Sequence, residues 1–263
     1  MQKESADNMS RIIAITNQKG GIGKTTTAIA IASILQSQGH RVLLIDADAQ
    51  GNASDTFGAE IDKEVTLYDV LLEYERVNIN EAIQHTKYGD IVAGDPLLRR
   101  ADALLASDMA GAFRLKDALK DLDGYEYIII DTAPALGELT KNALIAANEV
   151  IVPASADRYS IQGLSSIVQS VNAIQRSQLN PELRIAGIVL VAYPVTTNLG
   201  AEIQEELKGI AEKIGTKVFQ PPIRRTIRVQ QAHAHRMPII FYDRNCTAAQ
   251  DYLALVGNLL GGV

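Results

Sequence analysis

The chain has 263 residues, 47% of them apolar, and a formal net charge of −6 at pH 7, which suits one large α/β domain and argues against a globally basic nucleic-acid binder. No apolar run reaches the 18 residues expected of a membrane span. The single cysteine, Cys246, excludes a disulfide framework and any site built on two cysteines of this chain, and it favours the reducing cytoplasm.

The predicted elements alternate between apolar, β-branched strands and helical patterns. Residues 1–10 are polar and mixed in charge, so we expect a loose tail rather than a signal peptide, followed by one domain over 11–263. Strands are expected at 11–16, 41–46, 90–93, 126–131, 148–153, 184–192 and 217–219. Helices are expected at about 24–38, 101–120, 138–147, 160–177, 199–213 and 245–260, with shorter ones at 66–74 and 79–85.

Most of these strands are continuous apolar runs, such as Tyr127-Ile128-Ile129-Ile130. Runs of this kind indicate burial on both faces, so the fold class is α/β, with a doubly wound, mostly parallel sheet and helices on both of its faces. In the predicted helix 101–120, Met109 and Phe113 lie four residues apart and are expected in the core.

A glycine-rich loop follows the first strand and reads Lys19-Gly20-Gly21-Ile22-Gly23-Lys24-Thr25-Thr26. A strand, a glycine loop and then a helix are the context of a phosphate-binding loop, since glycines let the backbone wrap around phosphate oxygens and the helix points N–H groups at them. Lys24 would supply positive charge to the β- and γ-phosphates, and Thr25 a hydroxyl to Mg²⁺. Gln18 replaces the glycine of the usual G-x-x-x-x-G-K spacing, and Lys19 adds a second cation.

Two acidic motifs follow later strands. Asp46 and Asp48 come after one apolar run, and Asp131 ends another. A lone D-x-D pair reads as a solvated turn, but ligands of parallel sheets bind at the carboxyl ends of the strands, and here a phosphate loop precedes the pair. Mg²⁺ keeps several waters and takes few protein ligands, so one hydroxyl and one or two carboxylates suffice. Asp131 matches the carboxylate that holds Mg²⁺ through water in nucleotide hydrolases.

The glycine loop, D-A-D-A-Q-G-N at 46–52 and I-I-I-D-T-A-P at 128–134 together resemble the deviant Walker ATPases. Within them the chain is similar to the short ParA/Soj branch of partition ATPases, which lack an N-terminal helix-turn-helix, and the resemblance runs from Arg11 to about Leu260. It implies a P-loop NTPase that hydrolyses ATP slowly with Mg²⁺ and forms an ATP-bound sandwich homodimer. It also implies binding to non-specific double-stranded DNA, release by a ParB-like activator, and a cytoplasmic, nucleoid-associated location without a membrane.

The resemblance assigns roles residue by residue. Lys19 matches the signature lysine that reaches the partner subunit's nucleotide, and Asp48 the carboxylate that positions the attacking water. Asp46 matches a residue near Lys24 and the metal shell, and Thr26 an α-phosphate contact. The expected catalytic residues are therefore Lys19, Lys24 and Asp48, the nucleotide-binding residues are Gly20, Gly21, Ile22, Gly23, Lys24, Thr25 and Thr26, and the metal-site residues are Thr25, Asp46 and Asp131. The segment from Tyr193 to Asn198 lacks the arginine that relatives usually carry there, so the adenine contacts stay open.

Residues 222–244 contain five arginines against Asp243 alone, a local formal charge of +4. Guanidinium groups meet phosphates with two parallel donors, so this segment predicts a DNA-binding patch. Arg225 and Arg228 are its main candidates and Arg224 a weaker one. The alternative is a solvated helix face whose arginines pair with carboxylates of the same chain.

Three other functions compete with DNA partition. A related ATPase that positions another cargo, such as a protein microcompartment, has no distinguishing residue in this sequence. A MinD-type membrane-cycling ATPase needs a basic amphipathic C-terminal helix, but residues 251–263 carry no Lys or Arg, and their apolar stripe fits packing onto the sheet. An iron–sulfur reductase is excluded by the single cysteine.

Overall fold

The computed structural model of the chain describes residues 10–62, 64–74, 76–194 and 198–261. Residues 1–9 of the expected tail and 195–197 of the segment after the last long strand lie outside the described residues. A seven-stranded sheet crosses the molecule in the order β3-β4-β2-β5-β1-β6-β7. Its strands are β1 (Arg11–Ile15), β2 (Val42–Ala47), β3 (Ile83–Thr86), β4 (Gly89–Val92), β5 (Tyr127–Thr132), β6 (Glu149–Ala154) and β7 (Arg184–Leu190).

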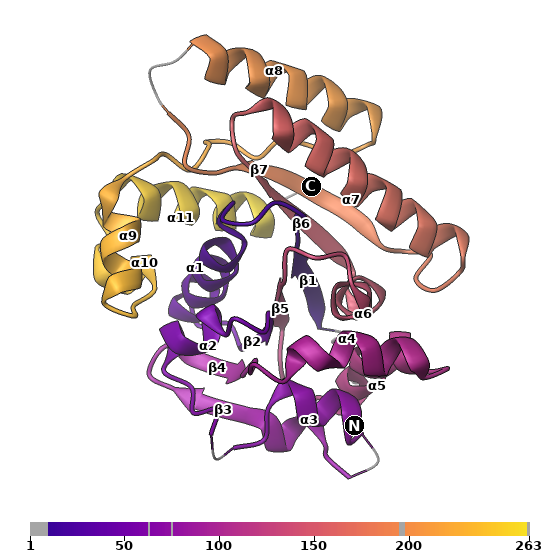
Figure 1. Cartoon of the computed structure of the whole chain (residues 1–263). Helices are drawn as coiled ribbons and strands as arrows, with labels where there is room; N and C mark the ends of the chain where they lie inside the picture. The colour runs from indigo at the N-terminus through magenta and orange to yellow at the C-terminus, as the bar shows by residue number, and fades with distance from the viewer. Residues whose placement is uncertain (1–9, 63, 75, 195–197, 262–263) are drawn as a thin grey trace, which may run out of the picture.

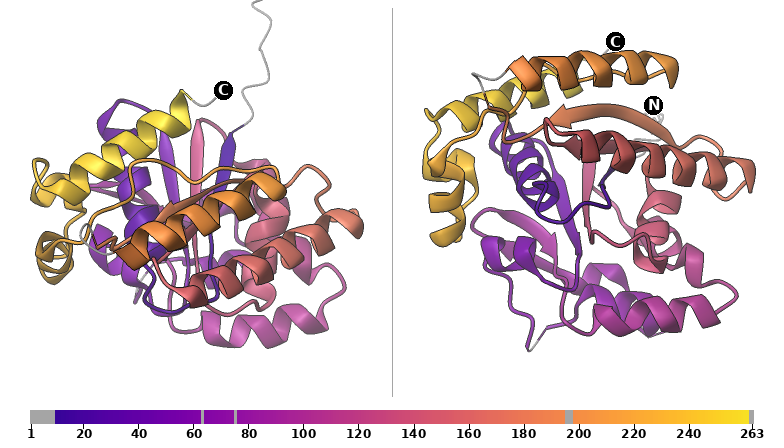
Figure 2. Two further views of the ribbon diagram at one scale, coloured as in Figure 1. Left: turned by 90° about the horizontal axis from the view of Figure 1, so that it is seen from above. Right: turned by 45° about the horizontal axis from the view of Figure 1, so that its top comes forward.

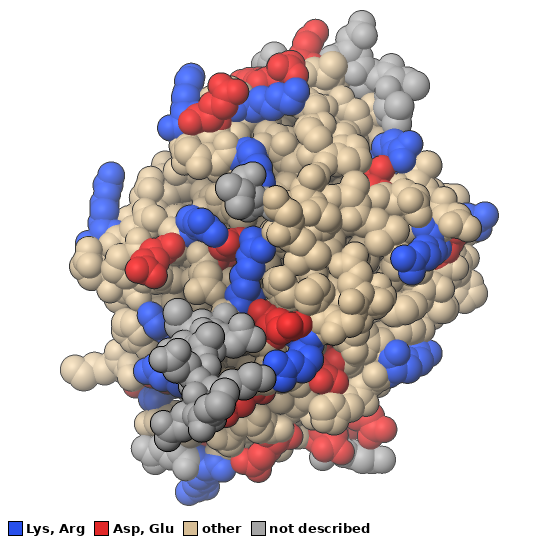
Figure 3. All heavy atoms as spheres, turned by 180° about the vertical axis from the view of Figure 1, so that it is seen from behind, with Lys and Arg blue, Asp and Glu red and all other residues tan. Residues whose placement is uncertain are grey.

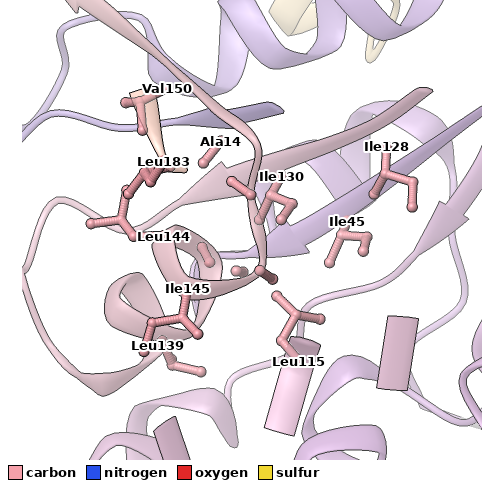
Figure 4. Close-up of a cluster of buried hydrophobic side chains, with 14 of the residues drawn as sticks. Ala14, Ile45, Leu115, Ile128, Ile130, Leu139, Leu144, Ile145, Val150 and Leu183 are labelled. Carbon is pink, nitrogen blue, oxygen red and sulfur yellow. The ribbon is translucent and has the colours of Figure 1, made fainter. Parts of the chain in front are cut away.

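Neighbouring strands of this sheet run parallel, except that β3 pairs antiparallel with β4 at one edge. Along a central strand, successive side chains point to opposite faces of the sheet and pack into different hydrophobic cores. Ala14 and Ile130 belong to the core drawn in Figure 4, whereas Ile13 and Ile129 belong to the core on the opposite face. Both faces are therefore buried, as the continuous apolar runs indicate, and the α/β fold class is confirmed.

Helices cover both faces, as Figures 1 and 2 show. One face carries α1 (Lys24–Ser37), α2 (Asn52–Phe57), α9 (Ile227–Ala234), α10 (Ile239–Tyr242) and α11 (Thr247–Leu260). The other carries α3 (Leu67–Leu72), α4 (Leu98–Ser107), α5 (Arg114–Ala118), α6 (Glu138–Ala146), α7 (Arg158–Arg176) and α8 (Asn198–Lys213), with short 3-10 turns η1 (Ile79–Ala82), η2 (Gly111–Phe113) and η3 (Leu119–Asp121). The apolar stripe of α11, Tyr252, Leu255, Val256 and Leu259, is buried as expected.

The expected single helix over 101–120 is divided into α4 and α5, because the chain turns after α4. The Asp108 carboxylate accepts the backbone N–H of Ala110 at 3.1 Å, and Gly111 lies so close to α4 that a β-carbon there would be 2.0 Å from the Leu105 carbonyl oxygen. Met109 is consequently fully exposed instead of buried, whereas Phe113 packs against the core.

Two further expectations are corrected at the edges of the sheet. Residues 83–86 form β3, which pairs with β4 through a tight turn, so the expected helix over 79–85 shrinks to η1. Residues 217–219 make one bridge, from Val218 to Ile188, in place of a strand. Helices α2, α9 and α10 were not expected. No helix among the described residues is long and apolar enough to cross a membrane.

Candidate functional site

The glycine loop lies between β1 and the N-terminus of α1, at the carboxyl edge of the sheet. Gly21 and Gly23 adopt left-handed backbone conformations, with φ of 70° and 82°. Among the described residues, apart from the adjoining ones in the chain, no heavy atom lies within 4 Å of where a β-carbon would stand on Gly20 or Gly21, so the loop is an open cradle. No side chain in the described part of the chain caps α1, which leaves its first N–H groups to an external anion.

Lys24 is buried beneath this cradle. Its Nζ donates to the Lys19 carbonyl oxygen at 3.3 Å. Burial lowers the pKa of Lys24, while the charges of Asp131 and Asp48 oppose that shift. The ammonium group therefore sits between the loop backbone and the acidic strand ends, where an anion in the cradle would meet it.

Asp46 is buried at the end of β2 and holds the neighbouring chain in place. Its Oδ2 accepts both the backbone N–H and the hydroxyl of Ser54, at 2.8 and 2.7 Å, and its Oδ1 accepts the Asp48 N–H at 3.2 Å. Burial raises the pKa of Asp46 to about 6, against the hydrogen bonds from Ser54 and Asp48. Because both oxygens already have donors, the contacts favour a positioning role for Asp46, and Ser54 is a contributor that the sequence analysis missed.

Asp131 lies directly opposite Asp46 on the paired strand β5. Both of its carboxylate oxygens are buried, and no described group donates to either at hydrogen-bond geometry, although the nearby Thr25 hydroxyl favours the ionised form. Burial, and then the charge of Asp46, raise the pKa of Asp131 well above its usual value, while Thr25 and Lys24 oppose the rise. Buried polar groups without partners are rare in proteins, and an ion that binds there explains them.

The residues around Asp131 fit Mg²⁺. The described part of the chain contains no group of three His, Cys, Asp or Glu side chains that could hold a metal by itself. Mg²⁺ does not require one, because it retains waters and binds one or two protein oxygens together with substrate phosphates. The Thr25 hydroxyl and the Asp131 carboxylate are oxygen donors of the right kind, next to a cradle for phosphates.

Asp48 lies just beyond β2 and faces a cavity of about 530 Å³ that Gly23, Lys24 and Thr25 also line. Its Oδ1 accepts the backbone N–H of Gln50 at 2.9 Å, which fixes the carboxylate. The cavity therefore places a carboxylate beside the phosphate cradle, with room for water between them.

Lys19 is bound within its own chain. Its Nζ lies 2.5 Å from Asp157 Oδ2 and 3.1 Å from Ser155 Oγ, both in the turn after β6. Partial burial raises the pKa of Asp157, but the hydrogen bonds from Lys19 and Ser155 lower it to about 2. The ammonium group of Lys19 thus has an ionised partner at the rim of the site.

A second cavity of about 540 Å³ lies on the other side of the loop, between it and residues 223–233. His233 of α9 lines both cavities, and its Nε2 is 3.2 Å from the Thr26 hydroxyl oxygen. The sequence analysis missed His233, since 207 positions separate the two residues and no local pattern marks that contact.

Carboxylates pair with three of the arginines in the basic segment 222–244 and offset part of its positive charge. Arg224 holds the buried Asp251 through its guanidinium group, with Nη2 donating to Oδ1 at 2.8 Å and Nε to Oδ2 at 2.9 Å, and its backbone N–H also donates to Oδ2 at 2.9 Å. Arg228 lies 3.3 Å from Asp243, and Arg236 lies 3.2 Å from Asp55. Arg225 is exposed and has no ion-pair partner within the described ranges. These contacts favour a structural role for Arg224. Arg225 is the DNA-binding candidate whose guanidinium group is most available to phosphates.

Charges of both signs are mixed on the face seen in Figure 3, where acidic and basic side chains surround a large uncharged area. That face therefore offers no patch of a single sign.

The comparisons with known proteins agree with this geometry. The AAA domain family AAA_31 matches residues 10–185. The chain is 39% identical over 251 residues to the sporulation initiation inhibitor protein Soj of Bacillus subtilis (strain 168), covering 94% of this chain and 97% of that protein. It is 38% identical over 256 residues to the chromosome partitioning protein ParA of Myxococcus xanthus (strain DK1622), covering 96% and 88%.

Among solved structures, cobyrinic acid a,c-diamide synthase of Mycobacterium smegmatis with bound ADP and magnesium superposes with a TM-score of 0.81 at 32% identity, over 96% of this chain and 94% of that one. The sheet order, the open glycine loop and the near full-length similarity to Soj and ParA lead to one assignment. The chain belongs to the ParA/Soj family of partition ATPases, P-loop enzymes that hydrolyse ATP.

Proposed function

We propose that this chain is a DNA-partitioning ATPase of one domain, residues 11–263, that dimerises when it binds ATP and Mg²⁺. The dimer binds double-stranded DNA of any sequence, and hydrolysis, stimulated by a ParB-like protein, releases it. The observation that carries the proposal is the buried Asp131 carboxylate without a partner, beside Lys24 and an open glycine cradle. Such a site suits a metal-bound triphosphate, and the ADP and magnesium in the Mycobacterium smegmatis structure support it.

Hydrolysis of ATP requires positioning and charge neutralisation far more than covalent chemistry. Lys24 neutralises phosphate oxygens, and the backbone of Gly20 to Gly23 holds them. Thr25 and Asp131 would hold Mg²⁺, which would supply positive charge to the phosphates. Asp48 accepts a hydrogen bond from the attacking water and orients it. A single orienting carboxylate without a stronger base makes the intrinsic rate slow.

Dimerisation would complete the site. Lys19 is held by Asp157 at 2.5 Å, so a lysine that serves the partner's nucleotide has to exchange this carboxylate for phosphate oxygens. Two apolar side chains near Lys19 are exposed: Tyr159 to 71% and Ile227 to 60%. Exposed apolar side chains beside a binding site are typical of interaction surfaces, and here they would lie between two facing copies.

DNA contact is assigned first to Arg225, with Arg228 beside it. Arg225 lines the same cavity as Lys19, so two copies that face each other through Lys19 would bring two Arg225 residues near one another. Two small patches on one dimer bind phosphates better than one, which explains why DNA binding would need ATP. The chain would then act in the cytoplasm on the nucleoid, with a plasmid or chromosome as its cargo. The alternative is a related positioning ATPase with another cargo, such as a protein microcompartment.

The test is DNA binding measured by fluorescence anisotropy on two labelled duplexes of unrelated sequence. We expect equal affinity for both duplexes, binding with ATP and Mg²⁺ but not with ADP, and a linear fall of log affinity with log salt concentration. Arg225→Ala should weaken binding to both duplexes alike, whereas Arg176→Ala, an exposed arginine at the far end of α7, should not. Binding that is indifferent to the nucleotide would contradict the proposal.

A further inference from the structure

Helix α9 lies across the candidate nucleotide site and touches its glycine loop. His233 of α9 contacts Thr26 at 3.2 Å. The two cavities that His233 lines, of about 540 and 530 Å³, also share Gly21, Ile22, Gly23 and Thr26. The imidazole therefore stands between the two spaces that a nucleotide on this loop would enter.

The chain around α9 is anchored on both sides of His233. Before the helix, Arg224 binds Asp251, with Nη2 and Oδ1 2.8 Å apart. After it, Arg236 pairs with Asp55 of α2 at 3.2 Å, and Asp55 lines the cavity that holds Asp48. Within the described part of α9, His233 is the side chain that hydrogen-bonds to the glycine loop.

We propose that His233 contacts the bound nucleotide next to Thr26, so that nucleotide binding changes the position of α9. The inference rests on the proposed function, since it requires a nucleotide on this loop. With its proton on Nε2, His233 donates to the Thr26 hydroxyl oxygen in the free chain, 3.2 Å away. When a phosphate oxygen binds at Thr26, the hydroxyl donates to that oxygen, and the Nε2 N–H turns from Thr26 to the same phosphate.

This change of partner bears on DNA because α9 begins beside the DNA-binding candidates. Arg225 immediately precedes Thr226, the N-cap of α9, and Arg228 lies in the first turn. A small shift at His233 would therefore move both arginines, and His233 would be a positioning residue for DNA binding as well as a nucleotide contact.

The experiment compares full-length chains carrying His233→Ala, His233→Gln or His235→Ala, using a fluorescent ATP analogue with Mg²⁺. The loss of one hydrogen bond to a charged phosphate predicts about tenfold weaker binding for His233→Ala. Glutamine keeps an N–H donor, so His233→Gln should return to within about threefold of the natural chain. His235→Ala leaves the loop contact intact and should bind normally.

Hydrogen exchange of the amides in 227–234 supplies the second readout. We expect the nucleotide to change their exchange in the natural chain and in His233→Gln, but not in His233→Ala. Normal affinity together with a normal nucleotide response of α9 in His233→Ala would overturn the inference. So would an equal loss in both His233 variants accompanied by a lower melting temperature without nucleotide, because that pattern means a packing role. If the natural chain binds no nucleotide, the proposed function itself fails.

Discussion

Replacing Asp131 by asparagine should raise the stability of the ligand-free chain and reduce its binding of ATP and Mg²⁺. The carboxylate is fully buried, lacks a hydrogen-bond partner among the described residues and faces Asp46 on the paired strand. A buried polar group without a partner costs about 1–3 kcal/mol. Asparagine removes the charge and offers an amide that can donate to Asp46. We expect Asp131→Asn to gain about 2 kcal/mol, which is about 4–8 °C in melting temperature for a chain of this size.

The gain should depend on pH in a defined direction. Since the pKa of Asp131 in the folded chain lies above its usual 3.8, the folded chain binds this proton more tightly than the unfolded chain. Stability of the natural chain therefore falls as pH rises from about 4 towards the folded pKa. The advantage of Asp131→Asn should be smallest below about pH 4 and complete above the folded pKa.

The assay is thermal unfolding of both chains, with and without ATP and Mg²⁺. A ligand present at a hundred times its dissociation constant stabilises a protein by about 2.7 kcal/mol, and the natural chain should show this gain while Asp131→Asn shows much less. Asp251→Asn is the matched control, because Asp251 is also buried but is paired with Arg224, so its replacement should destabilise. The reasoning is refuted if Asp131→Asn melts below the natural chain without ligand, or if the nucleotide stabilises both equally.

The remaining predictions concern single side chains. Lys24→Ala should abolish ATP binding in titration calorimetry, since it removes the buried cation of the cradle; unchanged affinity would count against the phosphate-loop assignment. Asp48→Ala should bind ATP and dimerise but release no phosphate in a hydrolysis assay, and hydrolysis at the natural rate would exclude Asp48 as the orienting group. Arg224→Ala should lower the melting temperature, because it removes the ion-pair partner of the buried Asp251, whereas Arg225→Ala should leave the melting temperature nearly unchanged. Equal effects of the two substitutions would contradict the structural role of Arg224.

Local patterns predicted much of the fold and the centre of the site. Continuous apolar runs gave the parallel strands, and the carboxyl edge of such a sheet brings Asp46 and Asp131 into register. The glycine loop predicted the open cradle, because its spacing reflects backbone conformations that glycine favours. These features depend on a few neighbouring residues, so one sequence is enough to find them.

Contacts between distant segments were not predictable in this way. Ser54 and His233 were missed because neither belongs to a recognisable sequence motif. Ser54 contacts Asp46 and His233 contacts Thr26 only once the chain has folded. The excess of arginines in 222–244 was visible in the sequence, but their pairing with Asp251, Asp243 and Asp55 was not. The break after α4 had a similar cause, since it depends on how closely Gly111 approaches Leu105.

The central claim is that ATP joins two copies of this chain through Lys19. Sedimentation velocity of the natural chain and of Lys19→Ala, each with Mg²⁺ and either ATP or ADP, tests it most directly. The natural chain should change from a particle of 28.5 kDa with ADP to one of twice that mass with ATP, while Lys19→Ala binds ATP and stays at the lower mass. A Lys19→Ala chain that dimerises with ATP as the natural chain does, or a natural chain that ATP leaves monomeric, would contradict the account.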